Sequence, residues 1–232
     1  IKAETTGPLK EHRLTPRIAD TAKALYIIYL GVSVACAVSY HLAGMEWEDA
    51  IMHMMTTVSL SGISPHDASF GYFNNPAVDA VAVDFMMISG FNFSLHFIAW
   101  RRKNLLIYFQ DAEARAWIAT AALMSALTII VLADAHVYDT SAETDRLAHI
   151  SMVSVITTTG YSTEDYASWP LGLPFLLLTA AAFATCAGST GGGIKMVRLL
   201  IILGMIRREM TKLLYPKAGV PRTLNKTPID DM

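Results

Sequence analysis

Two short segments rich in hydroxyl side chains and glycine are the parts of this sequence best suited to bind a dehydrated cation. The clearer one is TTTGYST, residues 157–163. Main-chain carbonyls of an extended segment can replace the hydration shell of a potassium ion when they line a narrow pore. Gly160 permits the positive φ angles that turn a carbonyl inward, and the threonines add stiffness and hydroxyl groups. Tyr161 could then wedge the segment against neighbouring helices.

The second such segment is SLSGIS, residues 59–64. It has Gly62 in the place of Gly160, but Ile63 stands where the other segment has Tyr161. The segment at residues 157–163 is close to the TVGYG filter of potassium channels, with the T, G and Y shared, so we interpret both segments as filter walls. A turn at the membrane surface is the alternative. The candidate ligands, with potassium as the metal, are Ser59, Leu60, Ser61, Gly62, Thr157, Thr158, Thr159 and Gly160.

A third motif, AGSTGGGIK at residues 187–195, superficially resembles a phosphate-binding loop. That loop needs lysine directly after its last glycine, followed by Ser or Thr. Here Ile194 precedes Lys195 and Met196 follows it, which excludes nucleotide binding. Non-helical backbone at membrane depth must be buried in protein or line water. We therefore predict an intramembrane gate loop, with a simple packing kink as the alternative. Its residues are Gly188, Ser189, Thr190, Gly191, Gly192 and Gly193.

The elements that must position these loops are apolar helices. Hydrophobic residues make up 53% of the chain and charged residues only 16%, whereas a soluble domain carries about a quarter charged residues. Four segments are long enough for a bilayer core of about 30 Å. They cover residues 22–43, 76–100, 114–135 and 170–206, the last broken by the glycines. Two shorter stretches, 46–57 and 144–157, are predicted half-helices whose C-terminal ends favour a cation.

The order of span, half-helix, loop and span occurs twice. The predicted fold class is therefore an all-α membrane protein with two tandem helix–pore-loop–helix (M1-P-M2) repeats. We divide the chain into a cytoplasmic N-terminal segment (1–17), a first repeat (18–111) with filter loop 58–64, a second repeat (112–206) with filter loop 157–163 and a helix broken at 188–193, and a cytoplasmic tail (207–232).

The distribution of charge predicts orientation. Of the 18 Lys and Arg residues, Arg146 alone falls on one side of this topology. The positive-inside rule makes the other side, with both termini, cytoplasmic. The acidic outer loops either concentrate cations near a pore mouth or are merely solvated. A net charge of −2 gives no sign of a nucleic-acid partner.

Several single residues are less informative. Cys36 and Cys186 lie in apolar runs and form neither a disulfide framework nor a zinc site. Asp84, within the second span, is either an ion-handling group or a packing residue. The start of the chain lacks Met and a signal peptide, so we read the chain as a piece of a larger protein or a trimmed one. No nucleophile–base set appears, so an enzyme is not expected.

Five stretches of the sequence resemble one known family, the Trk-type potassium uptake proteins of the Trk/Ktr/HKT superfamily. They are LTPRIADTAKALYIIYLG (14–31), SGISPHDASFGYF (61–73), ISGFNFSLHF (88–97), TTTGYSTEDYASWPL (157–171) and CAGSTGGGIKMVRLL (186–200). The last two are highly specific, and CAGSTGGGIK favours the bacterial Trk subclass over Ktr.

The resemblance implies potassium uptake across the bacterial inner membrane, with potassium as the ion and no organic cofactor. It implies four repeats in pseudo-fourfold order around one pore, of which this sequence matches the second and third. It also implies a homodimer, a lipid bilayer and a cytoplasmic nucleotide-binding regulatory ring (TrkA-like). Two repeats supply half a filter, so either flanking repeats were removed or two copies would have to assemble. The alternative function is a non-conducting scaffold or assembly subunit, or an incomplete fragment of the transporter. Passive and proton- or sodium-coupled transport both remain open.

Overall fold

The computed structural model describes residues 18–166, 169–170, 172–182, 185–215, 223–224 and 227–228. Its helices are α1 (Ile18–Leu42), α2 (Trp47–Val58), the 3-10 helix η1 (Ser69–Tyr72), α3 (Pro76–Gly90), α4 (Phe93–Arg102), α5 (Ile107–Gln110), α6 (Ala112–Asp134), α7 (Ser141–Ile156), α8 (Gly172–Ala182) and α9 (Met196–Leu214). Two short antiparallel strands, β1 (Thr223–Leu224) and β2 (Thr227–Pro228), lie near the C-terminus. The predicted segment 1–17 and most of the tail beyond residue 215 lie outside the described residues.

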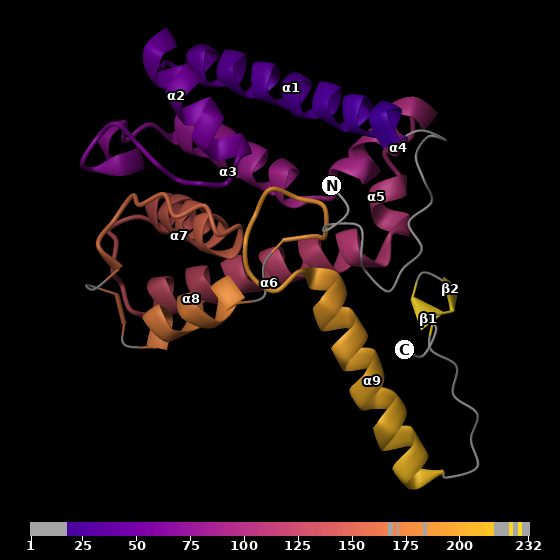
Figure 1. Cartoon of the computed structure of the whole chain (residues 1–232). Coiled ribbons are helices and arrows are strands. Elements are labelled where there is room, and N and C mark those ends of the chain that lie inside the picture. The colour runs from indigo at the N-terminus through magenta and orange to yellow at the C-terminus, as the bar shows by residue number, and fades with distance from the viewer. Residues whose placement is uncertain are drawn as a thin grey trace.

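The helices form two groups that follow the predicted repeats. In Figure 1, α1 lies beside α2, α3 and α4, while α6, α7 and α8 lie together, and α9 projects away from both groups. In the part of the chain described, α1 and α6 are each long and apolar enough to cross a membrane. Helices α2 and α7, of 12 and 16 residues, are too short to do so. The predicted fold class, all-α with M1-P-M2 repeats, is confirmed.

Local sequence signals explain where several helices begin. The side chain of Thr140 accepts a hydrogen bond from the Glu143 amide at 3.2 Å and caps α7. Asn75 caps α3 in the same way, and Pro76 occupies the first helical position, where its missing N–H costs nothing. Asp111 caps α6 through the Ala114 amide at 2.8 Å. These caps supply acceptors for amides that a helix start leaves unpaired.

The span predicted over residues 76–100 is not one continuous helix but a bent pair of helices. Helix α3 ends at Gly90, α4 begins at Phe93, and the two axes are bent by 95°. The Asn92 side chain accepts from the Ser94 amide at 2.8 Å and starts a new helix there. Gly90 lies so close to Trp117 that a Cβ would come within 2.8 Å of that ring. The bend therefore follows from a local cap and from contact with the other repeat, which an apolar run does not reveal.

The break predicted at residues 188–193 lies inside a longer non-helical stretch. Helix α8 ends at Ala182 and α9 begins at Met196, and residues 185–195 between them are not helical. A buried cluster that includes Trp117, Ile156 and Cys186 joins this stretch to α6 and α7. The loop is thus packed between the repeats, as Figure 1 shows for the orange segment that precedes α9.

Candidate functional site

The second filter loop begins where α7 ends. The Ser154 carbonyl accepts hydrogen bonds from the amides of Thr159 at 2.9 Å and Gly160 at 3.2 Å. Thr158 and Gly160 have positive φ angles of 60° and 91°. The hydroxyl of Thr157 bonds the Val153 carbonyl and the Thr159 hydroxyl, both at 2.7 Å. The loop is therefore a tight, internally bonded turn at the carbonyl end of a helix.

The first filter loop has the same backbone. The Thr56 carbonyl accepts from the amides of Ser61 at 2.9 Å and Gly62 at 3.5 Å. Leu60 and Gly62 have positive φ angles of 54° and 64°. The two loops also touch, because a Cβ on Gly62 would come within 2.0 Å of the Thr159 carbonyl oxygen. The structure thus brings the two predicted sets of ion-binding residues together.

The carbonyl oxygens of the two loops differ from those around them. Across the residues that the structure describes, no donor bonds the carbonyl oxygens of residues 59–62 or 157–160. Immediately afterwards, the Tyr161 carbonyl accepts from the Ser154 hydroxyl at 2.8 Å and from the Tyr166 hydroxyl at 3.2 Å. Burial raises the pKa of the Tyr166 phenol, which therefore remains a donor. The oxygens that a dehydrated cation needs are left without protein partners in both loops.

Tyr161 anchors the second loop to the first repeat. Its hydroxyl bonds those of Thr56 and Thr57 at 2.5 and 2.8 Å and donates to the His53 carbonyl at 3.2 Å. Its ring packs on Phe70 with 4.2 Å between centroids. The side chain is only 1% exposed. Tyr161 therefore wedges one repeat against the half-helix of the other.

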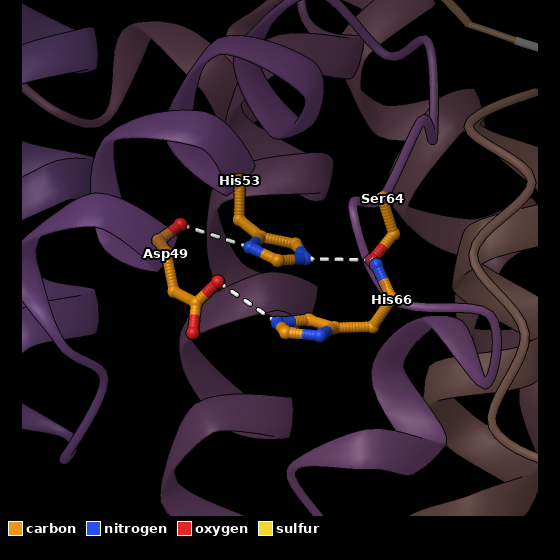
Figure 2. A network of polar contacts seen from close by, with 4 residues as sticks. All are labelled: Asp49, His53, Ser64 and His66. Atoms are coloured by element: carbon orange, nitrogen blue, oxygen red, sulfur yellow. Dashed lines mark hydrogen bonds and ion pairs between the residues drawn. The ribbon is translucent and has the colours of Figure 1, made fainter.

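A polar network holds the first loop to α2, as Figure 2 shows. His53 Nδ1 donates to the Asp49 carbonyl at 2.8 Å, and Nε2 lies 3.0 Å from the Ser64 hydroxyl. His66 Nε2 lies 2.8 Å from Asp49 Oδ1, and its ring stacks on Tyr72 at 3.7 Å. Because Nδ1 is the donor, the neutral His53 ring accepts from Ser64 through Nε2. The sequence alone does not reveal these partners of His53.

The predicted gate loop lies directly against both filter loops. The Thr190 hydroxyl donates to the Val58 carbonyl at 2.8 Å. The Gly192 amide donates to the Thr158 hydroxyl at 2.7 Å. A Cβ on Gly191 would come within 2.9 Å of the Thr157 carbonyl oxygen. Glycine here permits the close approach, so the gate and filter residues form one site.

The gate loop also pairs with the bend between α3 and α4. The Cys186 amide donates to the Gly90 carbonyl at 2.9 Å, and the Phe93 amide donates to the Gly188 carbonyl at 3.1 Å. Each broken helix thus supplies partners for backbone groups that the other leaves unpaired. Sequence reasoning missed this pairing because the two breaks are far apart in the chain.

Acidic and metal-ligating side chains are not prominent among the described residues of this site. Within the described residues, no group of three or more His, Cys, Asp or Glu side chains is arranged to hold a metal ion. Asp84 is exposed on α3 and takes no part in the filter contacts described above.

Comparison with known proteins gives consistent matches over the whole chain. The family model described as "TrkH: Cation transport protein" matches residues 1–231. The Trk system potassium uptake protein TrkH of Halomonas elongata is 44% identical over 230 residues, which are 99% of this chain and 48% of that protein. The protein of the same name from Escherichia coli K12 is 42% identical over 94% of this chain and 45% of its own length.

A solved structure agrees with these matches. The crystal structure of the potassium transporter TrkH from Vibrio parahaemolyticus superposes with a TM-score of 0.87 at 41% identity. The superposition covers 91% of this chain and 46% of that chain. The chain spans about half the length of the curated relatives it matches.

Proposed function

The chain belongs to the TrkH family of cation transport proteins, and we propose that its two filter loops form two walls of a potassium uptake pathway. The observation that carries this proposal is the set of carbonyl oxygens at residues 59–62 and 157–160, which accept no hydrogen bond among the described residues. Such oxygens can replace the water around potassium. The relatives' description as potassium uptake proteins supports potassium as the ion.

The half-helices favour a cation at the same place. Helices α2 and α7 end at Val58 and Ile156, immediately before the two loops. The C-terminal end of a helix carries a partial negative charge equivalent to about half an electron. Potassium would thus lose water to the carbonyl oxygens in a site whose field favours a positive ion.

The two repeats, 18–111 and 112–206, supply half of a fourfold filter. The other walls come from further repeats of the native polypeptide, whose relatives are about twice as long. The protein sits in the inner membrane with both termini cytoplasmic. It acts as a homodimer with a cytoplasmic nucleotide-binding ring (TrkA-like).

Residues 188–193 act as the gate beneath the filter. The support is their direct contact with it, through the bonds from Thr190 to Val58 and from Gly192 to Thr158. A loop in this position obstructs the path until it moves. Because it contains Gly191, Gly192 and Gly193, few side chains oppose that movement.

Potassium and sodium fluxes in vesicles containing the complete native polypeptide test the filter. In Gly160→Ala, we expect the preference for potassium over sodium to fall by roughly tenfold or more, because the φ of 91° strains any side chain. Gly31→Ala on α1 is the matched control, since its Cβ would meet nothing within 4 Å. An unchanged preference in Gly160→Ala would refute the filter role. Absence of flux in the unaltered protein would instead favour the scaffold.

A further inference from the structure

A single buried carboxylate joins the two ends of the gate loop. Glu113 lies in the first turn of α6 and is 9% exposed. Its Oε1 accepts hydrogen bonds from the Ala187 amide at 2.6 Å and from the Val197 amide at 3.0 Å. Ala187 stands at the start of the gate loop, and Val197 lies in the first turn of α9, just after it. One oxygen atom of another helix therefore sets the distance between the two loop ends.

The physical chemistry of the loop ends makes these bonds strong. The first amides of a helix have no partner within the helix, and its N-terminus favours a negative charge. Bonds from backbone amides to a carboxylate are stronger than neutral ones, and burial strengthens them further. Glu113 meets all of these conditions at the start of α9.

The loop is held from within as well. The Lys195 ammonium group donates to the Ser189 hydroxyl at 3.3 Å, to the Thr185 hydroxyl at 3.4 Å and to the Gly191 carbonyl. Lys195 thus shapes the loop, whereas Glu113 ties the shaped loop to α6. The contacts of Thr190 and Gly192 with the filter then depend on where those ends are held.

We propose that Glu113 is the positioning residue that holds the gate loop against the filter. The loop can withdraw only when the bonds from Glu113 to Ala187 and Val197 break or the loop ends move apart. This proposal rests on the proposed function only in that it takes residues 188–193 as the gate. Within the described residues, the side-chain hydrogen bonds of Glu113 go to Ala187 and Val197, not to the filter loops.

The test uses the complete native polypeptide in potassium-loaded vesicles, with Ser189→Cys as a reporter in the loop. Two rates are measured: modification of that cysteine by a charged methanethiosulfonate reagent, and basal potassium efflux. Cys36 and Cys186 are buried, and the same protein without the reporter gives the background. In Glu113→Ala, we expect both rates to rise by roughly tenfold, because two charge-assisted bonds are lost. The potassium over sodium preference stays unchanged, since the filter loops keep their own bonds.

Matched variants separate the bonds from the bulk of the side chain. Glu113→Gln keeps an acceptor oxygen, so it returns both rates most of the way to those of the parent. Glu113→Met fills a similar volume without an acceptor oxygen, so both rates should rise as much as in Glu113→Ala. It therefore tests the loss of the bonds even if the cavity in Glu113→Ala impairs folding. Glu209→Ala is the control, because among the described residues this exposed carboxylate of α9 bonds only Lys212.

The outcomes distinguish the two proposals. Unchanged cysteine modification in both Glu113→Ala and Glu113→Met overturns the positioning role, whatever the flux. Faster modification with unchanged flux upholds the positioning role and shows that the loop is not the gate. An increase in Glu113→Gln equal to that in alanine would also contradict the proposal, because the acceptor oxygen would then be irrelevant.

Discussion

The two filter loops share a backbone but differ in what anchors them. In both, one half-helix carbonyl, of Thr56 or Ser154, accepts two consecutive loop amides. In the second loop, Tyr161 is 1% exposed and bonded to α2, whereas Ile63, its counterpart, is 70% exposed. Each half-helix therefore stabilises the turn of the loop that follows it. The wedge residue Tyr161, in contrast, is held by the preceding repeat, whereas Ile63 remains exposed among the described residues.

The first loop lacks the threonines and the tyrosine of the second, yet it adopts the same backbone geometry. SLSG and TTTG adopt the same pattern of positive φ at their second and fourth residues. Main-chain bonds to the end of a helix do not depend on the side chains of the loop. Side chains instead decide how tightly each loop is fixed to its neighbours.

The largest expected effect is that of Gly62→Ala. Its Cβ would lie 2.0 Å from the Thr159 carbonyl oxygen, in addition to the strain of a φ of 64°. Displacing backbone in both loops should cost about 3 kcal/mol or more of stability and abolish potassium selectivity. Membrane abundance, thermal unfolding in detergent and the flux ratio measure this.

Gly160→Ala sharpens the comparison, because its Cβ would meet nothing within 4 Å and only the φ is strained. It should therefore be the milder of the two glycine variants. Equal effects would mean that the loops do not touch through Gly62.

Tyr161→Phe should have the next largest effect. It keeps the ring on Phe70 but removes the hydroxyl that bonds Thr56, Thr57 and the His53 carbonyl. We expect a loss of about 1–3 kcal/mol in the free energy of unfolding, since buried partners are left unpaired. Thermal or denaturant unfolding in detergent measures it. Tyr72→Phe, at an exposed tyrosine, is the matched control. A Tyr161→Phe protein as stable as that control would remove the proposed anchor.

A further comparison concerns the ties between each half-helix and the end of its loop, and it includes the smallest effect, that of Ser151→Ala. His53 bonds Ser64 in the first repeat, and Ser151 bonds Thr163 at 3.2 Å in the second. His53→Ala loses two bonds and leaves a cavity, so it should cost about 2 kcal/mol or more. Ser151→Ala should cost about 0.5–1 kcal/mol. Both are measured by unfolding. A larger loss of stability in Ser151→Ala than in His53→Ala would contradict the idea that the first loop depends more on its side-chain bond to the half-helix.

Much of the fold followed from apolar length and spacing. The half-helices predicted at 46–57 and 144–157 are α2 and α7, with ends shifted by up to three residues. The resemblance to Trk-type proteins is confirmed, and because the family is one of transport proteins, so is the expectation that the chain is not an enzyme. The ion-binding and gate residues stay predictions, now with geometry that supports them.

Other features could not be read from the sequence. The bend at Phe91 was missed because the run from Pro76 to Trp100 has the length and mean hydropathy of a membrane span. Glu113 was missed because a carboxylate at a helix start usually indicates a cap or a solvated end. Its role depends on two amides more than seventy residues away along the chain.

The sequence by itself determined the long apolar helices α1 and α6, the half-helices and the glycine positions, because these depend on local hydrophobicity and on backbone freedom. Only the tertiary structure decided which groups meet: Tyr161 with α2, Gly62 with Thr159, and Glu113 with both ends of the gate loop. The physical reason is that a broken helix must find hydrogen-bond partners for its unpaired backbone groups, and in an apolar environment those partners come from distant parts of the chain.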